Sequence, residues 1–333
     1  MEQTGFPPHG GETGDVRSLD PDRAYISIIE SSHRPVVKTF RWKDGAIEKQ
    51  HGAQISQGRA ITVEADTASD LLRIIEGLDP RQTIALGVLS TADKWMPLAS
   101  AAKAKPGEIS RTLKWFSFHE GPGWCLFDID TGDMPEGLLG QKGDRVWWDL
   151  ITELVPELQG LEHLVVPSSS AGIVPPNGEA IEATGLHVYV KLADAQSCPA
   201  LVQKVFDRLW ECGYGFVKIA KDGARHLRAP IDKTVASPER LIFEAAPDVH
   251  APLVRNPPPK RMQHGQFFRE IADADADRVS ELKAAALAET QKDAAARNRS
   301  YINGRATKLS KKLGISKTAA RKRVVARVRD RVL

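Results

Sequence analysis

The sequence of 333 residues contains only three cysteines, Cys125, Cys198 and Cys212, which are far apart. An odd number of widely spaced cysteines indicates neither a set of disulfides nor a cysteine zinc site, so we expect no zinc. Long apolar runs are also missing, since no stretch approaches the ~20 consecutive apolar residues of a membrane-spanning helix. We therefore expect a soluble protein with no membrane partner, and the cytoplasm is the expected compartment.

The N-terminal residues have no apolar segment of the kind found in a signal peptide. Residues 1–19 are rich in glycine, proline and charged side chains, a composition that predicts a disordered leader. A chain of this length exceeds the ~100–200 residues of a typical domain, so we expect one sizeable domain and an appendage.

Charge is distributed unevenly along the chain. The whole sequence has a formal net charge of +3, but residues 297–333 contain 13 Lys or Arg and one acid, Asp330. This tail has a net charge of +12, which leaves −9 for residues 1–296. A basic tail on an acidic body favours a polyanionic partner, although a solvated basic helix has the same composition.

Apolar periodicity predicts an α+β fold. Strands are expected at residues 24–29, 60–63, 124–130, 163–166, 186–192 and 240–243, and helices at residues 68–78, 145–158 and 199–212. Strands separated by helices favour a mixed sheet with helices packed on it. The expected parts are an N-terminal α/β module at 20–107, a core at 108–251, a stiff proline-rich linker at 252–264, and a helical tail at 265–333.

Two aspartates, Asp128 and Asp130, lie two positions apart in the strand expected at residues 124–130. Because strand side chains alternate, both carboxylates are predicted on one face, with Phe127 and Ile129 on the other. Polymerases and nucleases use such a pair to hold two metal ions ~3.5–4 Å apart. A charged strand edge or an Asp-rich turn would produce the same pattern.

A serine-containing loop and a strand histidine form a second candidate element. Ser169 follows the strand at 163–166, and His187 shares a predicted strand face with Tyr189 and Lys191. Gly185 would allow a phosphate to approach the backbone, and the serine loop offers hydroxyl and amide donors. We expect His187 to contact a nucleotide phosphate and not a metal, although a lone strand histidine is often structural.

A third acid, Asp232, is followed eight residues later by Arg240, whose guanidinium suits bidentate binding of phosphate. Several basic residues precede this pair, Arg228 among them. Surface salt bridges would explain the same residues. Asp222, which precedes Gly223, is an alternative for the third carboxylate.

These elements, in this order, resemble the motifs of the archaeo-eukaryotic primase and primase-polymerase superfamily. The superfamily's motifs are apolar-apolar-Asp-x-Asp/Glu, small-x-His and apolar-Asp, and residues 127–130, 185–187 and 231–232 match them. Eukaryotic-type members carry a nucleotide-contacting arginine at the spacing of Arg240. Residues 232–244 are similar to segments of primases encoded by phages, plasmids and integrated elements.

The resemblance implies both a fold and an activity. The fold would combine an RRM-like catalytic unit with the N-terminal α/β module. The activity would be that of a DNA primase or polymerase, a nucleotidyltransferase acting in DNA replication of a mobile element. Its partners would be a single-stranded DNA template, nucleoside triphosphates and a helicase domain or protein.

The resemblance also assigns roles to individual residues. Asp128, Asp130 and Asp232 would be catalytic and would hold two magnesium (Mg²⁺) or manganese (Mn²⁺) ions. The residues that would bind the triphosphate are His187, Arg240, Arg228 and Ser169.

Residues 309–320 predict a helix, a glycine turn and a second helix with an N-cap, which together form a helix-turn-helix pattern. The predicted nucleic-acid-binding residues of the second helix are Arg321, Lys322, Arg323 and Arg327. A charged helix leading into a further domain is the alternative interpretation.

Two other functions are consistent with the sequence. A two-metal nuclease or phosphoesterase would share Asp128 and Asp130. A non-catalytic replication initiator or DNA-binding protein could retain a primase-like fold and act through the basic tail.

Overall fold

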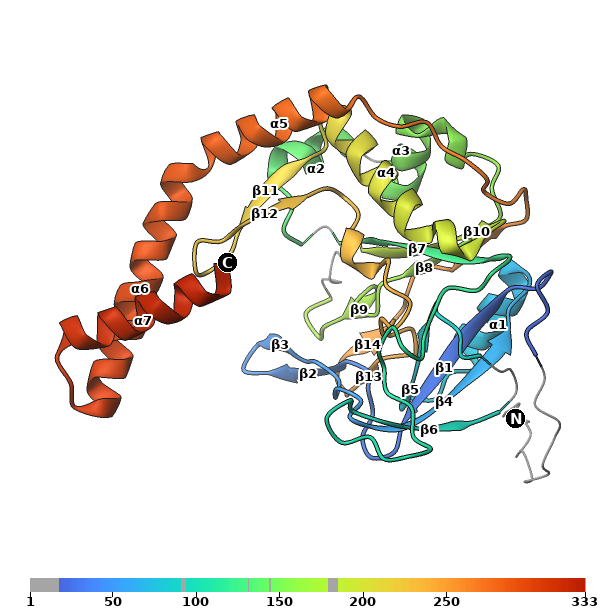
Figure 1. Ribbon diagram of the computed structural model, residues 1–333, viewed down its shortest axis with the longest axis horizontal. Coiled ribbons are helices and arrows are strands. Elements are labelled where there is room, and N and C mark those ends of the chain that lie inside the picture. Colours follow the sequence, from blue (N-terminus) through green and yellow to red (C-terminus); the bar gives the residue numbers. More distant parts are fainter. Residues whose placement is uncertain (1–17, 91–93, 131, 144, 179–184, 333) are drawn as a thin grey trace. The chain divides into compact units, whose positions relative to one another are not determined.

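The computed structural model describes residues 18–90, 94–130, 132–143, 145–178 and 185–332. Residues 1–17 of the expected leader lie outside this part of the chain. The fold is α+β, as expected, and divides into two compact units. Unit 1 comprises Met1–Gly132, Val146–Val205 and Ile231–Ala272, and unit 2 comprises Asp133–Arg145, Phe206–Pro230 and Asp273–Leu333 (Figure 1).

No helix in the described ranges is long and apolar enough to cross a membrane.

The first sheet of unit 1 is built from N-terminal strands. Its order is β5 (Gln82–Ala85), β1 (Tyr25–Ser31), β4 (Gln57–Glu64) and β6 (Met96–Ala99), all antiparallel. Helix α1 (Ala68–Glu76) begins at a capping box, in which the Thr67 hydroxyl accepts the Asp70 amide and the Asp70 carboxylate accepts the Thr67 amide. Leu71 and Ile75 of α1 pack with Ile26 in one buried cluster. The apolar helix face thus fixes α1 against the sheet.

The second sheet of unit 1 carries the predicted motifs. Its order is β15 (Arg261–Gln263), β8 (His163–Pro167), β10 (Leu186–Leu192) and β7 (Gly123–Ile129), again antiparallel. Leu126, Leu164 and Tyr189 share one face and join the same buried cluster as α1. On the opposite face, Phe127 stacks on Trp148 of α3 (Trp147–Leu154), with ring centroids 5.9 Å apart. The alternation predicted for β10 and for residues 124–129 of β7 is therefore confirmed, whereas β7 ends one residue before Asp130.

The segment at residues 252–264 is not the linker that the sequence predicts. Strand β14 (Val254–Arg255) pairs with β9 (Ile173–Val174), and β15 pairs with β8. Prolines cannot donate to a strand ladder, but they are tolerated beside edge strands, and here Pro257, Pro258 and Pro259 lie between the two short strands. The strand expected at residues 240–243 is reduced to a bridge between Ile242 and Ile84.

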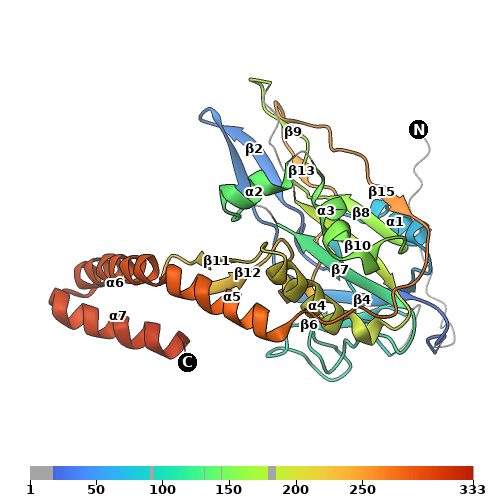
Figure 2. The same cartoon turned by 90° about the horizontal axis from the view of Figure 1, so that it is seen from above.

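A hairpin that the sequence analysis missed lies in unit 1. Strands β2 (Thr39–Lys43) and β3 (Ala46–Gln50) are joined by Asp44 and Gly45, whose φ angles are 51° and 78°. Two positive φ angles at an Asp-Gly pair are typical of a type I′ turn, a strong local signal for a hairpin. β13 (Asp248–Val249) lies beside β2 and pairs with it in parallel (Figure 2). Lys38 directly precedes β2 in the chain.

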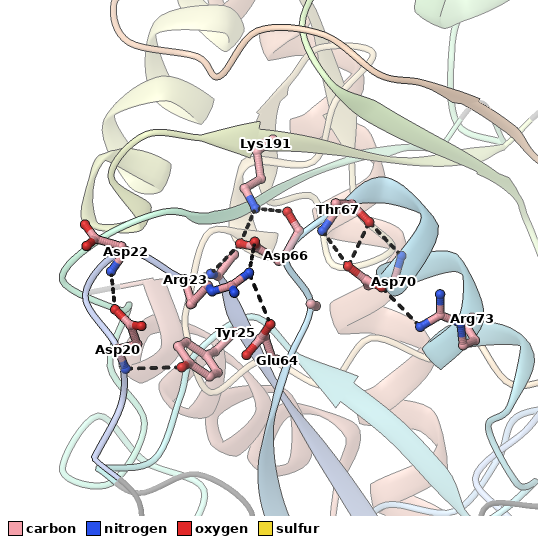
Figure 3. Close-up of polar contacts among 12 residues, drawn as sticks. Asp20, Asp22, Arg23, Tyr25, Glu64, Asp66, Thr67, Asp70, Arg73 and Lys191 are labelled. Atoms are coloured by element: carbon pink, nitrogen blue, oxygen red, sulfur yellow. Dashed lines mark hydrogen bonds and ion pairs between the residues drawn. The ribbon is translucent and has the colours of Figure 1, made fainter.

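A buried lysine joins the two sheets of unit 1. The Lys191 side chain is 0% exposed, and its ammonium donates to the Asp66 carbonyl and lies 3.5 Å from the Asp66 carboxylate (Figure 3). Asp66 also accepts a 2.7 Å hydrogen bond from Arg23. Burial lowers the pKa of Lys191, while the charges of Asp66 and Glu162 act in the opposite direction. This pair links β10 to the start of α1.

Unit 2 combines a hairpin with helices. Its elements are α2 (Glu136–Lys142), β11 (Phe216–Ile219), β12 (Arg225–Arg228), α5 (Ala276–Glu289), α6 (Gln291–Leu313) and α7 (Lys317–Val332), together with the C-terminal part of α4 (Cys198–Glu211). Arg297 of α6 donates to the Ile219 carbonyl, and Asn298 donates to the Asp222 carbonyl. These bonds fix the β11–β12 hairpin to α6. The helical tail, which the sequence predicts from residue 265, begins only at Ala276. Phe268 still belongs to the sheet region, where its amide donates to the Lys191 carbonyl of β10.

The end of unit 2 is a pair of packed helices. Helix α6 ends at Gly314, whose φ of 63° is left-handed. The Ser316 hydroxyl then accepts the Ala319 amide and caps α7. Ile302 and Ala306 of α6 are buried, as are Ala320 and Val324 of α7. The helix, glycine turn and capped helix expected at residues 309–320 are present.

Candidate active site

The antiparallel pairing of β7 and β10 brings the first two motifs together. Asp128 lies directly opposite His187 in the register. His187 Nε2 is 3.5 Å from Asp128 Oδ1, and both side chains are largely buried, with exposures of 21% and 29%. Asp130 follows the end of β7, where its carboxylate accepts the Gly132 amide at 3.1 Å. Residues far apart in the chain thus meet beside β7, which is the edge strand of this sheet.

Asp232 reaches the same edge through its backbone. The Asp232 amide donates to the Asp128 carbonyl at 2.8 Å, and Ile231 forms an antiparallel bridge with Ile129. The Asp232 carboxylate caps the 3₁₀ turn at Lys233–Val235 by accepting the Thr234 amide at 2.9 Å. Its alternative, Asp222, lies in the β11–β12 turn of unit 2, where its carboxylate accepts the Ala224 amide.

Glu244 is a central residue of the site that the sequence analysis did not identify. Its carboxylate accepts a 2.6 Å hydrogen bond from His187 Nδ1 and a second hydrogen bond from the Tyr189 hydroxyl, both at the same oxygen. The Glu244 side chain is 4% exposed. A buried carboxylate requires such partners because its charge is otherwise poorly solvated.

These contacts set the charge of His187. Burial lowers the pKa of His187, but the charge of Glu244 and the hydrogen bond to Asp128 outweigh it and raise the pKa to about 10. His187 is therefore an imidazolium at neutral pH, with both ring nitrogens donating. Burial also raises the pKa of Tyr189, as does Glu244, so the phenol remains neutral.

Further cations surround Asp128. Burial raises its pKa, but the hydrogen bond from His187 and the charges of His187, Lys38 and Arg240 lower it below the ordinary value. Burial and Lys49 lower the pKa of Lys38, against the opposing charges of Asp128, Asp130 and Glu244. The site is therefore a mixed cluster of carboxylates and cations, in which Asp128, His187 and Glu244 are largely buried and Asp130 and Arg240 are exposed.

A cavity of about 480 Å³ adjoins this cluster, and Glu244 and Ser169 both line it. The neighbouring Ser168 and Ser170 hydroxyls are 3.1 Å apart. Gly185 does not face open space: a Cβ there would lie 3.3 Å from the Ile129 carbonyl and 3.4 Å from Ser168 Cβ. The glycine therefore permits close packing of the chain on itself, where the sequence analysis expected approach of a phosphate.

The donor atoms of the site suit a hard divalent cation. Asp128, Asp130 and Asp232 present carboxylate oxygens, which are the ligands that Mg²⁺ and Mn²⁺ prefer. In the described ranges, no group of three or more His, Cys, Asp or Glu side chains stands in a metal-holding arrangement. Each of the three carboxylates instead contacts a partner within the protein, namely His187, the Gly132 amide or the Thr234 amide.

Several predicted residues lie in unit 2. Arg228 is in β12, and Arg321, Lys322, Arg323 and Arg327 are in α7. The residues of the site that the sequence did not indicate are Lys38 and Glu244. Alternation along β10 predicted that Tyr189 shares the face of His187, but no role was assigned to it. Lys38 and Glu244 carry no motif, and only the tertiary fold identifies them.

Unit 1 thus presents a carboxylate and imidazolium cluster on an antiparallel sheet of an α+β protein. Comparisons of the chain with protein-family models, with curated proteins and with solved structures found no match.

Proposed function

We propose that the chain is a template-directed nucleotidyltransferase of the primase-polymerase type. The observation that carries this proposal is the convergence of the three sequence motifs on one sheet edge. His187 faces Asp128 across β7 and β10, and the Asp232 amide bonds to the Asp128 carbonyl at 2.8 Å. Residues of one catalytic function must meet in space, whereas unrelated surface residues need not.

The carboxylates supply the metal-binding half of the proposed site. Asp128, Asp130 and Asp232 would hold two divalent cations, Mg²⁺ or Mn²⁺. Such ions supply activation of an attacking 3′-hydroxyl and neutralisation of charge on a pyrophosphate leaving group. Asp128 has a depressed pKa and is ionised at neutral pH, as a metal ligand must be.

The cations supply the phosphate-binding half. His187 is held as an imidazolium by Glu244, and its ring is fixed by hydrogen bonds at both nitrogens. Arg240 and Lys38 add positive charge close to Asp128. Donors in fixed positions suit a triphosphate. The bound triphosphate would take the place of the carboxylates as the negatively charged partner of these cations. Ser169, on the adjoining cavity, would add a hydroxyl donor, and Arg228 is proposed as a further triphosphate ligand from the sequence alone.

The proposed setting follows from the resemblance to primases. The substrates would be nucleoside triphosphates and a single-stranded DNA template, during cytoplasmic replication of a phage, plasmid or other mobile element. A helicase domain or protein would be the partner that supplies the single strand. The basic residues Arg321, Lys322, Arg323 and Arg327 would contribute to DNA binding through phosphates. The first three are consecutive and exposed, so they would contribute less than Arg327.

A single assay distinguishes the proposed function from its alternatives. The full chain is incubated with a single-stranded template, labelled nucleotides and Mn²⁺ or Mg²⁺, and the products are separated on a denaturing gel. Extended products support the proposal. Shortened template with no extension would indicate a nuclease, and a mobility shift with neither product would indicate a non-catalytic DNA-binding protein.

Two matched aspartate variants test the site itself. Asp232→Asn should reduce extension about a hundredfold, because it removes a charged metal ligand. Asp222→Asn, in the unit 2 turn, should leave extension within about twofold of the wild type. If Asp222→Asn abolishes extension and Asp232→Asn does not, the assignment of the third carboxylate is wrong.

A further inference from the structure

A basic groove lies between the last two helices of unit 2. Its volume is about 240 Å³, and its lining residues are Tyr301, Arg305, Lys308, Leu309, Lys312, Val324 and Arg327. The cationic side chains among them are exposed, whereas Val324 is buried. Figure 1 shows α7 turning back to pack against α6. The groove therefore has an apolar floor and a positively charged rim.

The rim is one continuous stripe on α6. Tyr301, Arg305, Lys308 and Lys312 follow one another at intervals of four, three and four residues, so they project from the same helix face. From Arg305 to Lys312 the helix rises about 10 Å, at 1.5 Å per residue. Cations spread over this length of one helix face can contact successive phosphates of one strand. The stripe can therefore follow a phosphodiester backbone.

The predicted recognition residues of α7 are arranged differently. Arg321, Lys322 and Arg323 are consecutive and exposed, and consecutive helical residues point about 100° apart. They cannot all contact one ligand at once. Arg327, by contrast, lies on the face of α7 that lines the groove. The structure therefore concentrates converging charge on α6 and not on the start of α7.

An aromatic ring at one end of the stripe indicates the form of nucleic acid. Tyr301 is partly exposed, and the Arg305 guanidinium lies 5.8 Å from its ring centroid. A positive groove with an accessible aromatic ring suits a single strand, whose unstacked bases can stack on the ring while its phosphates contact the cations. The bases of a duplex are already stacked on each other and are not available to Tyr301.

We propose that the groove between α6 and α7 binds single-stranded DNA, with Arg305, Lys308, Lys312 and Arg327 on the phosphates and Tyr301 stacked on a base. The groove would be the template-binding surface of the proposed primase, so the inference rests on that function for its biological role. Binding itself is measured without nucleotides or divalent cations, which separates its outcome from that of catalysis.

The test compares two variants of the full chain that each lose three positive charges from the tail. One is Arg305→Gln/Lys308→Gln/Lys312→Gln, in the groove. The other is Arg321→Gln/Lys322→Gln/Arg323→Gln, on the exposed part of α7. Fluorescence anisotropy with a labelled 20-nucleotide single strand and with the matching duplex gives affinities at several salt concentrations, and circular dichroism checks that both variants are folded.

The groove variant should lose at least about tenfold in affinity for the single strand, and its salt slope should fall by about 2, at 0.7 per contacted phosphate. The α7 variant should lose less than about threefold. Tyr301→Leu should weaken single-strand binding by about fivefold or more with an unchanged salt slope, and Tyr301→Phe should restore it. Equal losses in the two triple variants, a larger loss in the α7 variant, or tighter binding of duplex than of single strand would overturn the proposal.

Discussion

The two candidate sites of this protein organise charge in opposite ways. At the centre of the unit 1 site the charged groups are largely buried and paired: His187 contacts Glu244 at 2.6 Å and Asp128 at 3.5 Å. In the groove of unit 2, the cations at 305, 308, 312 and 327 are exposed, and among the residues whose side chains are described no acid lines the groove.

This difference indicates two ways to prepare a surface for phosphate. A buried cation needs an internal carboxylate because its charge is poorly solvated. A ligand must therefore displace that carboxylate in order to bind the cation. The buried pairs also fix the geometry of the donors before the ligand arrives. An exposed stripe needs no internal partner, since water and counterions solvate it, and binding releases those counterions. The first arrangement suits chemistry at a defined position, and the second suits a long polyanion.

The largest effect that would separate the two sites is expected for Asp128→Asn. The substitution keeps the shape of the side chain and removes its charge, so extension should fall about a thousandfold, or about 4 kcal/mol in activation free energy. Single-strand binding by the groove should remain within about twofold, as measured by anisotropy. Extension at a near wild-type rate would show that Asp128 is not part of a catalytic site. A parallel loss of DNA binding would show that the two sites do not act separately.

The internal pairing of unit 1 is tested by Lys191→Ala. The lysine is 0% exposed and contacts Asp66, so truncation leaves a cavity and a carboxylate that has lost one partner. We expect the free energy of unfolding, measured by urea denaturation, to fall by about 3 kcal/mol. Lys191→Met, which fills the volume, should recover part of this loss, and Lys105→Ala, at an exposed position, should have almost no effect. A change below about 1 kcal/mol for Lys191→Ala would show that the buried pair does not hold the sheets together.

The smallest effect concerns the acid dependence of stability. Burial raises the pKa of Asp66, but the hydrogen bond from Arg23, the Ala24 amide and the charge of Lys191 lower it below the ordinary value of 3.8. The folded state therefore binds this proton less tightly, and Asp66 contributes stability above about pH 4 that is lost as pH falls through its folded-state pKa.

Asp66→Asn should accordingly cost about 1–2 kcal/mol at pH 7. The difference from wild type should shrink as pH falls below about 4, because the wild-type carboxyl is then protonated as well. Thermal melts at pH 7, 5 and 3 measure this difference, with the exposed Asp22→Asn as the control. A pH-independent difference would assign the effect to lost packing and not to the charge of Asp66.

Local pattern predicted the elements that carry the motifs. Strand β10 spans the residues expected from alternation, Leu186–Leu192, and the shared face of His187 and Tyr189 follows from the same rule. The hairpin at β2 and β3 was predictable from Asp44-Gly45 but was missed. The linker predicted for the proline-rich segment is wrong, because proline composition does not reveal whether neighbouring residues pair with an edge strand.

The sequence by itself determined the α+β class, the strands and helices with strong periodicity, and the concentration of charge in the last 37 residues. These features depend on side chains close together in the chain. The tertiary structure alone decided that Glu244 bonds to His187, that the Asp232 backbone joins Asp128, and that Arg327 lines the same groove as Tyr301. Those contacts depend on strand pairing and helix packing between distant segments, where hydrogen-bond register and burial select partners that spacing along the chain does not specify.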